Sequence, residues 1–73
     1  MTESELKELS QSIEDLSSYR ARLHNEITNV GKKLRLTKSK IESTLNNHTE
    51  LKEIDKIIKG LTRKKEEELN RKN

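Results

Sequence analysis

The apolar residues in the first half of this chain recur at alternating spacings of three and four residues. They are Leu6, Leu9, Ile13, Leu16, Leu23, Ile27, Val30, Leu34 and Ile41. This spacing is the heptad pattern of a helix that packs against other helices, and a seven-residue repeat favours a left-handed supercoil. The pattern predicts an all-α fold, an elongated coiled coil in which one long helix spans about residues 3–70.

Two local features bear on the ends and the continuity of this helix. Thr2 and Glu5 have the spacing of a capping box, which places the start of the helix near residue 3. Gly31 costs a helix about 1 kcal/mol relative to alanine, but its neighbours are compatible with a helix. We therefore expect Gly31 to lie inside a helix rather than to end one.

Arg20 interrupts the apolar row at a heptad a position. A charged side chain at this position reduces stability, yet it can fix the register or select a partner that offers a carboxylate. In the alternative interpretation, the long side chain extends its guanidinium to solvent and has no partner. In either case we include Arg20 with the apolar heptad residues as part of the helix-packing row, which we call the seam.

The first heptad frame fails at residues 46–49, and a second apolar row with the same spacing follows it. The members of this second row are Leu51, Ile54, Ile58 and Leu61. The chain then divides into a heptad helix over 1–45, a joint or register shift at 46–49, and a second amphipathic segment over 50–73 with a frayed, charged tail. No glycine or proline lies at 46–49, so a continuous rod is favoured over a helical hairpin that turns there.

Composition explains why a partner is expected. Apolar residues make up 27% of the chain and charged residues 40%, and Tyr19 is the one aromatic residue. Such a chain holds too little apolar material for a globular core and either buries a narrow stripe against a partner or is disordered. The absence of proline favours the helix, although a chain that folds only on its partner stays an alternative.

Several function classes find no support in the sequence. Without cysteine there is neither thiolate catalysis nor a cysteine zinc site, and His24 and His48 lie too far apart for a helical metal pair. No nucleophile–base pair and no phosphate loop is present, so we expect no enzyme, no cofactor and no metal. The absence of a signal sequence and of a long apolar run predicts no membrane span and an intracellular location, cytoplasmic or nuclear.

The charges are unevenly distributed along the seam. Residues 1–16 carry five acidic residues and one lysine, whereas residues 17–40 carry seven basic residues and one glutamate. A parallel in-register homodimer would pair Lys33 with Lys38 and gain nothing from these charges. The pattern therefore favours an antiparallel homodimer or a hetero-oligomer with other coiled-coil proteins.

A dense basic run lies near the end of the first seam. Its members are Lys32, Lys33, Arg35, Lys38 and Lys40. We interpret this run first as a patch that matches an acidic partner. Nucleic acid is the less favoured alternative, because no aromatic side chain is interleaved for stacking on bases.

The segment 45–60 is faintly similar to the signature of a family of small recombination accessory proteins. The similarity rests on the run Glu50–Ile54 and on Gly60, whereas His48 and Thr49 depart from the signature. This resemblance implies a nucleic-acid accessory role in recombination or chromatin. The favoured function is a non-catalytic coiled-coil assembly subunit or adaptor of a multi-protein complex, acting through helix–helix association.

Overall fold

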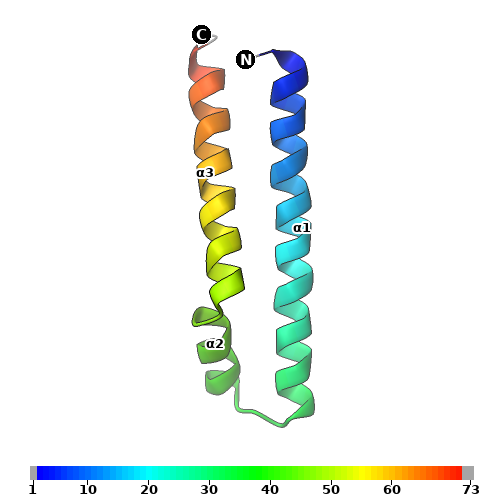
Figure 1. Ribbon diagram of the computed structural model, residues 1–73. Helices are drawn as coiled ribbons and strands as arrows, with labels where there is room; N and C mark the ends of the chain where they lie inside the picture. Colours follow the sequence, from blue (N-terminus) through cyan, green and yellow to red (C-terminus); the bar gives the residue numbers. More distant parts are fainter. Residues whose placement is uncertain (1, 72–73) are drawn as a thin grey trace.

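The chain folds into an elongated helical hairpin. The computed structural model describes residues 2–71, which form α1 (Glu3–Lys33), α2 (Lys38–Asn46) and α3 (Thr49–Arg71). One arm is α1, and the other arm consists of α2 and α3, which lie nearly in line and antiparallel to α1 (Figure 1). The molecule measures 51 × 16 × 16 Å. The all-α, elongated fold predicted from the heptads is confirmed.

Helix α1 begins with the capping box expected from the sequence. The backbone N–H of Glu5 donates to Thr2 Oγ1 at 3.2 Å, and the N–H of Thr2 donates to the carboxylate of Glu5 at 3.4 Å. Two of the helix's otherwise unpaired N–H groups are thereby satisfied. This end of α1 is fixed by local sequence alone.

The single long helix over 3–70 is only approximate, because the chain reverses at residues 34–37. Arg35 adopts a positive φ of 58°, the left-handed conformation that ends many helices. The N–H of Leu36 donates to the carbonyl of Gly31 at 2.9 Å, and the N–H of Arg35 donates to that of Lys32 at 3.0 Å. These two bonds form a Schellman motif in which Arg35, rather than a glycine, occupies the left-handed position. The motif ends α1, so the chain forms a hairpin instead of the expected rod.

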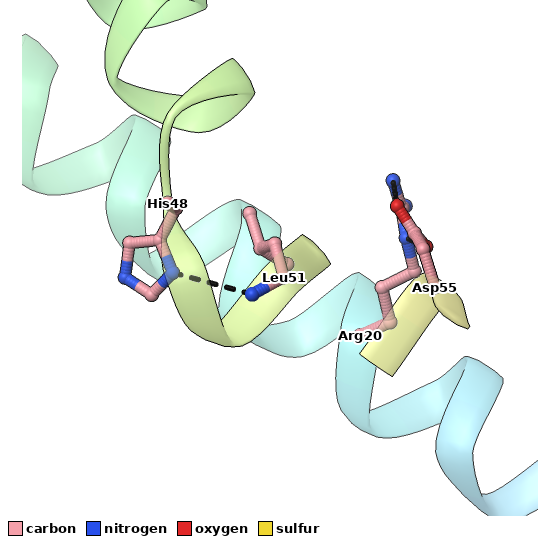
Figure 2. Close-up of polar contacts among 4 residues, drawn as sticks. All are labelled: Arg20, His48, Leu51 and Asp55. Carbon is pink, nitrogen blue, oxygen red and sulfur yellow. Dashed lines mark hydrogen bonds and ion pairs between the residues drawn. The ribbon is translucent and has the colours of Figure 1, made fainter. Parts of the chain in front are cut away.

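The interruption expected at 46–49 is present, as a joint between α2 and α3. Helix α2 begins after Thr37, whose side chain accepts from the N–H of Lys40, and it ends at Asn46. The ring Nδ1 of His48 then accepts from the N–H of Leu51 at 3.4 Å, at the start of α3 (Figure 2). Because a side chain caps α3 here, the joint forms without glycine or proline.

The contact between α1 and α2 depends on Gly31, which lies inside α1 and is buried. A Cβ atom built on Gly31 would lie 2.7 Å from Cγ1 of Ile41, closer than carbon atoms pack. The missing side chain therefore allows α2 to approach α1 at the turn. Elsewhere the hairpin buries Leu9 near the start of α1, and Leu51 and Ile54 of α3.

The charged residue in the seam has its carboxylate partner in the same chain. Arg20 Nε donates to Asp55 Oδ1, and Nη2 lies 3.4 Å from Oδ2 (Figure 2). The side chains remain 39% and 47% exposed, respectively. The pair joins α1 to α3 at mid-length.

Candidate interaction surface

The apolar stripe of α1 is buried at one end and open at the other. Leu9 and Val30 occupy the same heptad position, yet Leu9 is 9% exposed and Val30 is 55% exposed. On a straight helix a heptad stripe rotates by about 20° per heptad, which amounts to about 60° over three heptads. The stripe that faces α3 near the termini is therefore turned partly aside from the second arm near the turn.

This rotation leaves an uncovered surface on the hairpin. Tyr19, Leu23 and Val30 are spaced by four and seven residues, so they lie on one face of α1. Leu34 continues this face to the turn, where it is 67% exposed, and Ile41 of α2 borders it. We call the set Tyr19, Leu23, Val30, Leu34, Ile41 and Ile57 the open apolar face.

The half of this face nearest the turn is hollowed into a groove of about 380 Å³. Its apolar lining is supplied by α1, the turn and α2, and comprises Leu23, Ile27, Val30, Leu34, Leu36 and Ile41. Its polar lining residues are Glu26 of α1, Thr44 of α2 and His48 of the joint. A groove of this composition suits an apolar side-chain row of another helix rather than a polar substrate.

A polar contact connects the open apolar face to α3. The hydroxyl of Tyr19 donates to Glu50 Oε1 at 2.6 Å. This hydrogen bond and the negative charge of Glu50 raise the pKa of the Tyr19 phenol above its ordinary value of 10.0. Because Ile57 follows Glu50 by seven residues, the half-exposed Ile57 lies on the same side of α3 as the contact.

The basic run predicted as a binding patch surrounds the hairpin turn. Lys32 and Lys33 end α1, Arg35 lies in the turn, and Lys38 and Lys40 occupy the first turn of α2. All five residues are exposed. The structure thus gathers these charges at one end of the molecule, which we call the basic tip, next to the groove.

The side of the hairpin opposite the open apolar face is polar. A cleft there lies beside the Arg20–Asp55 ion pair and is lined also by His24, Glu42 and Lys52. Its apolar lining is limited to the half-buried Leu45 and to Leu51, which is already buried. The two sides therefore differ in chemistry, and only one offers apolar surface for a further helix.

The predicted seam residues are used mainly within the chain. Of the two rows, Leu9, Leu51 and Ile54 are buried, and Val30 and Leu34 are exposed. The others are half-buried, namely Leu6, Ile13, Leu16, Arg20, Leu23, Ile27, Ile41, Ile58 and Leu61. The first apolar row packs against the second row within one chain. The part of the first row nearest the turn stays available for other contacts.

Sequence reasoning missed three parts of this surface, namely Tyr19, Ile57 and the close approach at Gly31. Tyr19 precedes Leu23 by four residues and Val30 by eleven, a signal visible in the sequence but outside the heptad rows. The loss of apolar d positions at Thr37 and Thr44 was also a signal that the first helix ends near residue 34. The partners Glu50 and Asp55 could not be assigned before the turn was located.

Residues 2–71 offer neither a metal-binding cluster nor a membrane-spanning helix. No group of three or more metal-binding side chains lies together in this range. None of the three helices has an apolar stretch long enough to cross a membrane.

A family model described as a domain of unknown function, DUF8630, matches residues 7–70. The chain therefore belongs to the DUF8630 family. The match includes the turn, all of α2 and nearly all of α1 and α3, so the family's domain corresponds to the whole hairpin. No curated protein and no solved structure matches the chain. The resemblance of residues 45–60 to recombination accessory proteins stays a prediction.

Proposed function

We propose that this DUF8630 protein is a non-catalytic assembly subunit or adaptor that joins a multi-protein complex by helix–helix association. The open apolar face supports this proposal, above all the 55% and 67% exposure of Val30 and Leu34 beside an apolar groove. Contiguous exposed apolar surface on a small protein commonly marks a site of protein association. An intracellular location, cytoplasmic or nuclear, is part of the proposal.

A photo-crosslinking amino acid at position 30, in cells that produce the protein, tests the proposed function. We expect discrete crosslinked products from position 30 and none from position 69, because Leu69 lies near the other end of the hairpin. Leu69 is 44% exposed, so it is a matched control for a partly exposed apolar side chain. Equal labelling at both positions, or no product at position 30, would contradict helix–helix association through this face.

A second candidate function is a nucleic-acid accessory role through the basic tip. The observation in its favour is the gathering of five exposed bases around one turn. If all five contact phosphates, the logarithm of the binding constant should fall with the logarithm of the salt concentration with a slope of about −4 to −5. Absence of DNA and RNA binding at low salt would remove this candidate.

A further inference from the structure

We propose that the open apolar face binds a second copy of this chain, with the two hairpins antiparallel and forming a four-helix bundle. The inference rests on the proposed function and names the partner of the same face. Three observations carry it: the surface area of the hairpin, the charges at its two ends, and the position of the apolar residues along it.

The hairpin exposes far more surface than a compact protein of its size. Its accessible surface is 5974 Å², whereas a compact monomer of the same mass exposes roughly 4,700 Å². The excess, roughly 1,300 Å², is larger than the ~800 Å² per partner of a standard interface. The elongated hairpin as a whole therefore exposes enough surface to accommodate an interface of standard size.

The charges select the antiparallel orientation. The basic tip carries five basic residues, with Glu42 as the nearby acid, while residues 2–16 at the other end of α1 carry five acids and Lys7. Residues 56–71 of α3, at that same end of the hairpin, carry six bases and three acids, so that end is close to neutral overall. In a parallel dimer the two basic tips would lie together and repel. In an antiparallel dimer the two tips are apart, and each lies beside the region around Asp15 of the second copy.

The position of the apolar residues sets the overlap of the two hairpins. The open apolar face extends from Leu34 at the turn to Tyr19 and Ile57 near mid-length, so most of it lies in the turn half of the molecule. The Tyr19–Val30 parts of the two faces overlap most fully when the α1 helices cross near residues 24–25. In this register Val30 of one copy packs against Tyr19 of the other.

The same register brings a specific charge pair together. Asp15 and Lys33 lie 18 residues apart, which is five full helical turns, so they project from the same side of α1 about 27 Å apart. At this separation they cannot pair within one chain. In the antiparallel dimer, Asp15 of each copy faces Lys33 of the other, and Gln11, which donates to Asp15 at 2.9 Å, lies one turn away.

The mass of the purified protein in solution tests the second copy as the occupant. Light scattering should give twice the chain mass, and Val30→Gln should raise the dissociation constant about tenfold or more. The control Leu69→Gln, with circular dichroism to verify helicity, should leave the dissociation constant unchanged. A monomer at all concentrations would overturn the dimer, while heterologous crosslinks from position 30 in cells would still support the proposed function.

Charge reversal tests the orientation. Asp15→Lys and Lys33→Asp should each weaken the dimer several-fold, and the double variant should regain most of the loss, because the two positions meet only between copies. If the dissociation constant of the double variant rises by as much as the two single effects combined, the register is wrong. As a second readout, Leu34→Cys should not form disulfide-linked dimers. Efficient linkage at position 34 would show parallel tips and overturn the antiparallel arrangement.

Discussion

Arg20 on α1 and Asp55 on α3 lie 35 residues apart in sequence and form the ion pair that joins the two arms of the hairpin. At a heptad a position, an arginine requires a partner that supplies a carboxylate or a route to solvent. Arg20 has both a carboxylate partner and access to solvent. Two of its guanidinium nitrogens contact Asp55, and each of the two side chains is more than one-third exposed. Because water screens both side chains, the pair contributes little to the stability of the fold.

We predict a small coupling energy for this pair. A double-mutant cycle with Arg20→Ala and Asp55→Ala should give about 0.5 kcal/mol, and no more than about 1 kcal/mol, because water screens partly exposed charges. Arg20→Leu should raise the free energy of unfolding by about 1 kcal/mol, since it extends the apolar row. Urea unfolding at one fixed protein concentration measures both values. A coupling above about 2 kcal/mol would contradict a screened pair.

The two glycines should respond to alanine with opposite signs. Gly60 has open space around its Cα, so Gly60→Ala should raise the free energy of unfolding by about 1 kcal/mol through helix propensity. Gly31→Ala should lower it by about 1 kcal/mol, because overpacking against Ile41 outweighs the same propensity gain. Thermal or urea unfolding of both variants provides the comparison.

An Ile41→Ala background provides the control for the glycine prediction. This substitution removes the Cγ1 and Cδ1 atoms that approach Gly31. In that background Gly31→Ala should become stabilising. If Gly31→Ala remains as destabilising as in the natural chain, contact with Ile41 is not the cause.

The turn should be improved by glycine at position 35. Arg35 has a φ of 58°, which costs an L-residue with a side chain about 1 kcal/mol relative to glycine. Arg35→Gly should therefore raise the free energy of unfolding by about 1 kcal/mol. Arg35→Ala removes the same charge without relieving the backbone, and it should change stability little. Equal effects of the two variants would show that charge, not backbone conformation, is responsible.

The phenol of Tyr19 should ionise at a higher pH in the folded chain than in the unfolded chain. The hydrogen bond to Glu50 and its negative charge raise the pKa of Tyr19 above 10.0. Because the folded pKa is the higher one, this contact contributes to stability below about pH 10, and the contribution is lost as the pH rises through the folded value.

Absorbance titration measures this ionisation directly, since Tyr19 is the only aromatic residue that absorbs in this range. Glu50→Gln should move the midpoint back towards the ordinary value, because the negative charge is gone. Glu53→Gln on the same helix is a control that should leave the midpoint unchanged. A midpoint that is the same in the natural chain and in Glu50→Gln would contradict the contact.

Local sequence determined the helical nature of the chain and where some helices begin or break. The capping box at Thr2 and Glu5 acts within one turn, and the 3-4 spacing of leucine and isoleucine makes any helix here amphipathic. The joint at 46–49 was also predictable, because the heptad frame fails there. These features depend on residues that are close in the chain, so their physics can be derived without knowing the fold.

Tertiary structure decided where the chain reverses and which apolar residues remain uncovered. Arg35 does not favour a left-handed conformation by itself; the turn is held by the packing of α2 on Gly31 and by the alignment of α1 with α3. Once the arms are aligned, the heptad stripe rotates relative to the second arm, which buries Leu9 and exposes Val30. The sequence alone determined that α1 has an apolar stripe, and only the hairpin determined which end of that stripe is open to a partner.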